Sequence, residues 1–78
     1  MHIGNCIREK LKKDGRSAAW LAGRICCTRT HVYKIFKKES IDTALLVRIS
    51  HALDYDFFEE ISNELANVDD DEEHPAGF

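Results

Sequence analysis

The fold of this chain is decided by residues 17–36, which read SAAWLAGRICCTRTHVYKIF. Ser17 and Thr28 belong to the residue types that cap helix N-termini, so the stretch predicts two short helices joined by a tight turn. Apolar residues follow helical spacing on both: Leu21, Ala22 and Ile25 on the first, and Val32, Ile35 and Phe36 on the second. We therefore expect one face of each helix to be buried.

The opposite side of the second helix carries basic and hydrogen-bonding side chains. On a helical wheel they lie away from the apolar face: Arg29, Thr30, Tyr33, Lys34 and Lys37. A helix that is anchored on one face and basic on the other suits insertion into the major groove of DNA.

Three further helices are predicted by the same apolar spacing. The first begins near Ile3 and ends at Gly15, the residue type favoured just past a helix C-terminus. Asp42 or Ser40 can cap the fourth. The apolar positions of the last two helices are Leu46, Ile49, Ala52 and Leu53, then Phe57, Phe58, Ile61 and Leu65. The sequence thus predicts a compact, all-α domain of five helices over residues 1–66.

Charge is strongly segregated along the chain. Residues 1–53 hold all eleven Lys and Arg with four acids, whereas residues 54–78 hold ten acids and neither Lys nor Arg. Such asymmetry indicates a body that binds a polyanion and an acidic appendage, which the net charge of -3 conceals. Residues 67–78 are predicted to be a disordered acidic tail. The tail either keeps the chain soluble, competes with DNA for the basic face, or binds a basic partner.

Several classes of protein are disfavoured. No signal peptide and no apolar run of roughly 20 residues is visible, which predicts a cytoplasmic location without membrane contact. Cys6, Cys26 and Cys27 are expected to be reduced, and the adjacent pair lacks the two-to-four-residue spacing of zinc ligands. No oxyanion or Gly-rich phosphate loop accompanies them. We therefore predict no metal, no cofactor and no catalysis.

Residues 17–36 resemble the helix-turn-helix of the lambda-repressor-like Cro/CI (XRE) family of bacterial and phage DNA-binding regulators. The matching residues are the Leu21-Ala22 step, Ile25 at the end of the first helix, Thr28-Arg29-Thr30 where the family often has Ser-Arg-Ser, and the buried Val32, Ile35 and Phe36. The segment from Ile41 to Leu53 resembles the family's fourth helix. Cys26 occupies a turn position that is often Gly, where a positive φ would make its Cβ cost about 1 kcal/mol.

The resemblance implies a role for each matching position. The base-reading positions would be Arg29, Thr30, Tyr33 and Lys34, with Arg29 able to donate two hydrogen bonds to a guanine. The phosphate contacts would be Ser17, His31, Lys37 and Lys38. A single module of this size buries little surface, so we expect a homodimer on DNA. The candidate dimer or partner residues are Trp20, Phe57, Phe58, Ile61 and Leu65, which otherwise serve as packing residues of the monomer.

The sequence leaves two functions from different classes. The first is sequence-specific binding of double-stranded DNA by a transcription regulator. The second is a protein-interaction module, an antitoxin-like or anti-repressor partner, built on the same fold.

Overall fold

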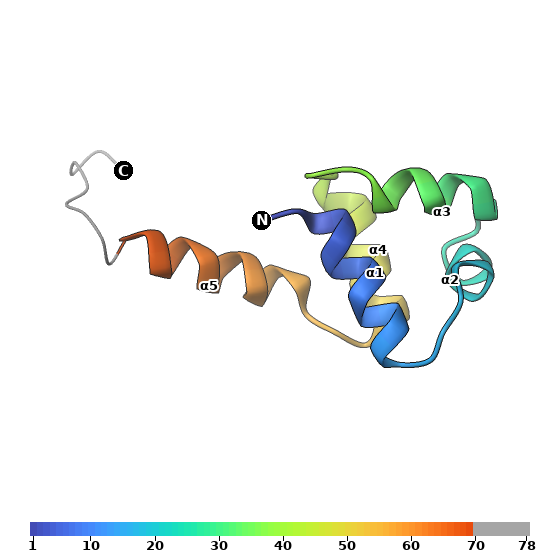
Figure 1. Cartoon of the computed structure of the whole chain (residues 1–78), viewed down its shortest axis with the longest axis horizontal. Helices are drawn as coiled ribbons and strands as arrows, with labels where there is room; N and C mark the ends of the chain where they lie inside the picture. The colour runs from blue at the N-terminus through green and yellow to red at the C-terminus, as the bar shows by residue number, and fades with distance from the viewer. Residues whose placement is uncertain (70–78) are drawn as a thin grey trace.

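The computed structural model describes residues 1–69, with side chains described through residue 66, and this part of the chain folds into five α-helices without a strand (Figure 1). The helices are α1 Ile3–Lys13, α2 Ala18–Arg24, α3 Arg29–Phe36, α4 Thr43–Leu53 and α5 Phe57–Asp69. The predicted all-α class and the five helices are confirmed. Of the predicted tail, residues 70–78 lie outside the described residues.

The predicted caps explain where the helices begin. The side chains of Ser17 and Thr28 accept hydrogen bonds from the backbone amides of Trp20 (3.0 Å) and His31 (3.1 Å). Asp42, rather than Ser40, caps α4, since its carboxylate accepts from the amide of Leu45 at 2.8 Å. These side chains satisfy amide groups that the first turn of a helix leaves unpaired, and so fix the helix starts.

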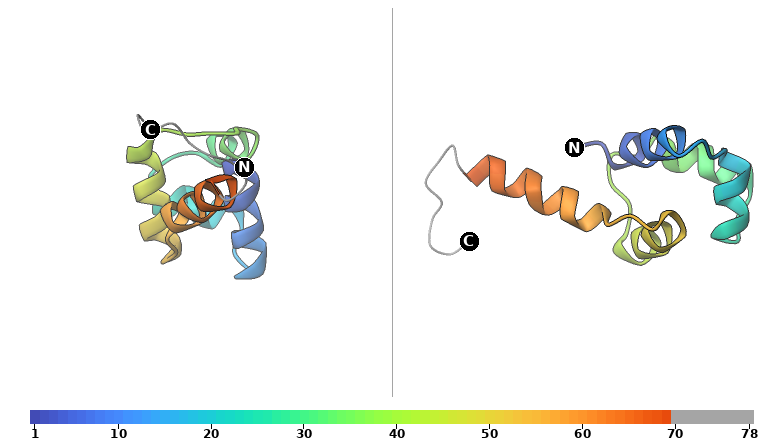
Figure 2. Two further views of the ribbon diagram at one scale, coloured as in Figure 1. Left: turned by 90° about the vertical axis from the view of Figure 1, so that its left-hand side faces the viewer. Right: turned by 90° about the horizontal axis from the view of Figure 1, so that it is seen from below.

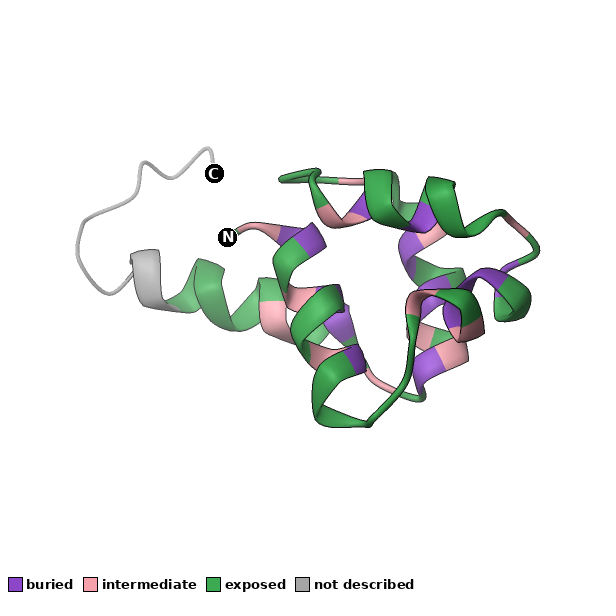
Figure 3. Cartoon of the chain, turned by 45° about the vertical axis from the view of Figure 1, so that its right-hand side comes forward, coloured by how far each residue is buried: buried purple, intermediate pink, exposed green. Residues whose placement is uncertain are grey.

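The core lies between α1, α2, α3 and α4 and is closed by the first residue of α5 (Figure 3). Its members are apolar residues at helical spacing: Ile3, Ile7, Leu11, Leu21, Ala22, Ile25, Val32, Ile35, Leu46, Ile49, Leu53 and Phe57. Phe36, expected on the buried face of α3, is only half-buried. The body therefore holds α3 in place through Val32 and Ile35.

The start of α1 lies directly against the end of α3. The amides of Ile3 and Gly4 donate to the carbonyls of Glu39 (3.0 Å) and Lys38 (2.9 Å), which follow α3. A Cβ on Gly4 would lie 2.6 Å from the carbonyl carbon of Phe36 and closer still to the carbonyl oxygens of Ile35 and Phe36. Only glycine permits this close approach of the start of α1 to the end of α3.

Helix α5 projects away from the other four helices (Figures 1 and 2). Phe57 is fully buried, but Phe58, Ile61 and Leu65 are 36%, 41% and 47% exposed. An apolar face is therefore left uncovered along α5 beyond its first residue.

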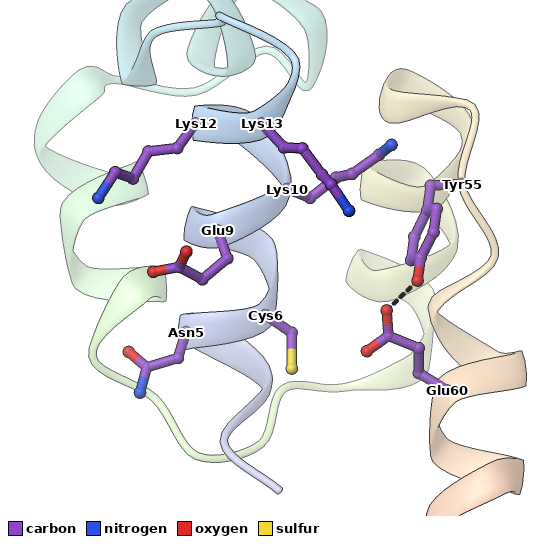
Figure 4. A pocket seen from close by; sticks show the side chains of 8 residues that line it. All are labelled: Asn5, Cys6, Glu9, Lys10, Lys12, Lys13, Tyr55 and Glu60. Atoms are coloured by element: carbon purple, nitrogen blue, oxygen red, sulfur yellow. Dashed lines mark hydrogen bonds between the residues drawn. The ribbon is translucent and has the colours of Figure 1, made fainter.

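Polar contacts tie α5 to the body on one side. The Tyr55 hydroxyl donates a hydrogen bond to the Glu60 carboxylate, and the Lys10 ammonium lies 4.8 Å above the Tyr55 ring (Figure 4). Glu60 also faces Cys6 of α1, and the pKa of this thiol is raised by burial and by the carboxylate. The hydrogen bond to Glu60 is the main cause that raises the pKa of Tyr55 to about 12.

The hydrogen bond between Tyr55 and Glu60 should make the stability of the fold fall at alkaline pH. Because the pKa of Tyr55 in the folded chain lies above its ordinary value of 10, the bond stabilises the fold below about pH 10. That contribution is lost as pH rises through about 12, where ionised Tyr55 would repel Glu60. We expect Tyr55→Phe to remove this loss, measured as the urea midpoint at rising pH. Tyr33→Phe, which changes an exposed tyrosine outside this contact, should retain it; an unchanged loss in Tyr55→Phe would contradict the assignment.

Candidate nucleic-acid interface

Helices α2 and α3 pack closely against each other and are joined by a turn over residues 25–28. Cys26 has φ of +58°, a left-handed conformation, and the next amide, of Cys27, donates to the Ala22 carbonyl at 2.9 Å. The positive φ at Cys26 is the conformation in which a glycine would be unstrained. The turn thus has a fixed geometry despite its cysteine.

The strain at Cys26 leads to a prediction. Cys26→Gly is expected to raise the free energy of unfolding by up to about 1 kcal/mol, since the cost of a Cβ in this conformation outweighs the added freedom of the unfolded chain. Urea unfolding followed by circular dichroism measures the change. Cys26→Ala is the matched control, because it removes the exposed thiol and keeps the Cβ. Equal stability of the Gly and Ala variants would show that the Cβ is not strained.

A side chain from α4 holds the same turn. The guanidinium of Arg48 donates a hydrogen bond to the carbonyl of Ile25, the C-cap residue that follows α2. The carbonyls at a helix C-terminus have no partner within the helix, and a cation placed there also interacts favourably with the helix dipole. Arg48 was not among the residues selected from the sequence, since no local pattern links it to a turn 23 positions away.

The outward face of α3 presents the predicted base-reading residues to solvent. Arg29, Thr30, Tyr33 and Lys34 are all exposed, while Val32 and Ile35 on the same helix are buried. The Tyr33 ring meets the Phe36 ring edge-on, with centroids 5.9 Å apart, which places Tyr33 at the margin of this face. The structure therefore brings the four predicted residues together on one exposed surface.

The predicted phosphate contacts are exposed as well. His31, Lys37 and Lys38 lie on α3 and just after it, and Ser17 lies at the start of α2. The Ser17 hydroxyl is already engaged in capping α2, so its structural role is established.

The segment of sequence that forms this surface contains no acidic residue. Residues 15–38 contain six Lys and Arg and neither Asp nor Glu. The ion pairs among the side chains of residues 1–66 lie elsewhere, between Lys10 and Asp14 (3.3 Å) and between the Met1 amino group and Glu64 (3.0 Å). The cations of α3 are thus available to an external anion.

The candidate partner residues divide into two groups. Phe57 is part of the core, and its packing role is established by complete burial. Phe58, Ile61 and Leu65 are exposed on α5. Trp20 is half-buried on α2, and the guanidinium groups of Arg16 and Arg24 lie over its ring.

The three cysteines are free thiols. Cys26 is exposed, and Cys6 and Cys27 are half-buried. Burial raises the pKa of Cys27, whose thiol points to the Thr28 carbonyl at 3.5 Å. Within the described residues, no three His, Cys, Asp or Glu side chains are grouped so that they could hold a metal ion.

Two further findings concern the whole described chain. Among residues 1–69 no helix has the length and apolar character needed to cross a membrane. No protein-family model, curated protein or solved structure matches this chain.

Proposed function

We propose that this protein is a transcription regulator that binds double-stranded DNA through a lambda-repressor-like helix-turn-helix formed by α2 and α3. The observation that carries the proposal is the two-sided character of α3. Its inner face is anchored by Val32 and Ile35, and its outer face offers only cations and hydrogen-bonding groups. Such a helix fits the major groove, whose base edges carry hydrogen-bond donors and acceptors.

The proposed roles follow position along α3. Arg29 and Thr30 at its N-terminus would contact base edges first, and Lys34 lies one turn later. Tyr33 at the margin would contact a thymine methyl or a phosphate. The residues that would hold the DNA backbone, and so set position without specifying sequence, are Ser17, His31, Lys37 and Lys38.

We also propose that the protein binds DNA as a homodimer through α5. A helix of 13 residues is only marginally stable in water unless its apolar side is packed. A second copy of α5 would cover Phe58, Ile61 and Leu65. Two modules would read half-sites about 34 Å apart, and would supply the contact area that one small module lacks.

Selection from a pool of random duplexes at several salt concentrations tests the proposal. The full chain is expected to enrich a sequence with two related half-sites. Its affinity should fall steeply with salt, since each neutralised phosphate releases a counterion. Failure to enrich any sequence, with no salt-dependent binding, would refute the DNA-binding function.

The exposed apolar face of α5 favours one alternative, a protein-interaction module on the same fold. A partner of this kind would bind Phe58, Ile61 and Leu65 rather than the face of α3. Both functions use the apolar face of α5, and only the DNA-binding function needs the outer face of α3, so Arg29 is the residue that separates them. Arg29→Ala would leave partner binding intact, and Ile61→Glu would abolish it, because a charge would enter an apolar contact.

A further inference from the structure

A second basic site lies in a cleft between α2 and α4. The cleft is open to solvent, has a volume of about 410 Å³ and is lined by Gly23, Arg24, Arg48, His51 and Ala52. No residue of α3 lines it, so it is distinct from the proposed base-reading surface. We propose that this cleft binds a phosphate group, a role that does not rest on the proposed DNA-binding function.

The charges of the cleft are not balanced by the protein. Two arginines and a histidine line it, and no carboxylate does. Both ion pairs among the side chains of residues 1–66 involve other groups. Placing like charges together costs free energy, and an anion in the cleft would offset that cost.

Both guanidinium groups are held in place by neighbouring residues. Arg48 is fixed from one side by its hydrogen bond to the Ile25 carbonyl. The guanidinium of Arg24 makes a cation–π contact with Trp20, which lies one turn earlier on α2; the guanidinium carbon is 5.5 Å from the ring centre. Groups that are already positioned lose less entropy when a ligand binds, so the site is partly organised in advance.

The wall of the cleft at Gly23 leaves room for a ligand. A Cβ built on Gly23 would meet no atom within 4 Å. The planar fork of a guanidinium matches two oxygens of a phosphate, and the imidazole of His51 adds a third donor. A phosphate monoester or pyrophosphate therefore fits the chemistry, and the phosphate could belong to a free compound or to a DNA backbone.

Fluorescence of Trp20, the single tryptophan, provides a direct test, because binding of an anion by Arg24 alters the contact above the ring. Pyrophosphate is titrated into the full chain at constant ionic strength, with isothermal calorimetry in parallel. We expect saturable binding, weakened about tenfold or more in Arg24→Gln, which loses a charge-assisted hydrogen bond, and in His51→Ala, which loses the imidazole donor.

Arg16→Gln is the matched control. Arg16 lies over the same ring at 4.4 Å but does not line the cleft, so this variant should bind pyrophosphate as the wild type does. Binding that is absent, does not saturate, or weakens equally in all three variants would overturn the proposal.

A second arm identifies the source of the phosphate. Addition of duplex DNA releases pyrophosphate from the cleft if the site takes a backbone phosphate, and leaves it bound if the site takes a free compound. Either result supports the site. A chain that binds pyrophosphate but no DNA would refute the proposed function and leave this inference intact.

Discussion

Replacing Gly4 by alanine is expected to lower the free energy of unfolding by about 3 kcal/mol, the largest effect on stability that we predict for a single methyl group. The new Cβ would overlap the carbonyl groups of Ile35 and Phe36, which are backbone atoms and cannot rotate away. Helix propensity favours alanine by about 1 kcal/mol, so the overlap dominates. The hydrogen bond from the Gly4 amide to Lys38 would be disturbed by the same shift.

Urea unfolding followed by circular dichroism measures this loss, and Gly23→Ala is its control. Gly23 also lies within a helix, but a Cβ there meets no neighbour within 4 Å. The control should therefore be stabilised by about 0.5–1 kcal/mol, the usual gain of alanine over glycine in a helix. A Gly4→Ala variant as stable as the wild type would mean that α1 and α3 do not meet at this point.

Replacing Arg29 by alanine is expected to weaken specific DNA binding by about 1–3 kcal/mol, or roughly fivefold to 150-fold, and to relax preference at one base. Arg29 is the first residue of α3 and is exposed, so its loss leaves the core and the Thr28 cap unchanged. Selection from random duplexes with both proteins, followed by titration of the enriched site, gives the affinity and the base preference.

Lys37→Ala separates base reading from backbone contact. Lys37 follows α3 and is proposed to bind a phosphate, so its loss should weaken binding to all sequences alike and reduce the salt slope by about one. If Arg29→Ala has no effect while Lys37→Ala does, the protein binds DNA but reads bases with other residues. If neither variant changes binding, the proposed face of α3 is refuted.

Local patterns predicted much of this structure because local physics determines it. Ser17 and Thr28 cap the helices they were expected to cap, since capping involves only the next few residues. Helical spacing identified the core for the same reason: a buried face repeats along one helix. The exposed face of α3 is the complement of that buried face and was predicted with it.

Features that depend on distant contacts were not predictable in this way. Nothing near Gly4 in the sequence indicates that α3 ends against it, and nothing near Arg48 indicates that it holds the α2–α3 turn. Similarly, Phe57 and Phe58 are equivalent in local pattern, yet one is buried and the other exposed. The direction in which α5 leaves the body decides between them, and that direction follows from packing around the whole core.

The uncovered face of α5 has a consequence for how the chain is ordered. Local stability within a protein ranges from almost zero to the full free energy of unfolding, and helices with few buried contacts lie at the low end. Beyond Phe57, the apolar residues Phe58, Ile61 and Leu65 of α5 are exposed, so we expect its outer turns to open without unfolding of α1–α4. A partner that covers this face would then supply the free energy that orders the outer turns of α5. Binding of that partner and formation of those turns would be a single equilibrium.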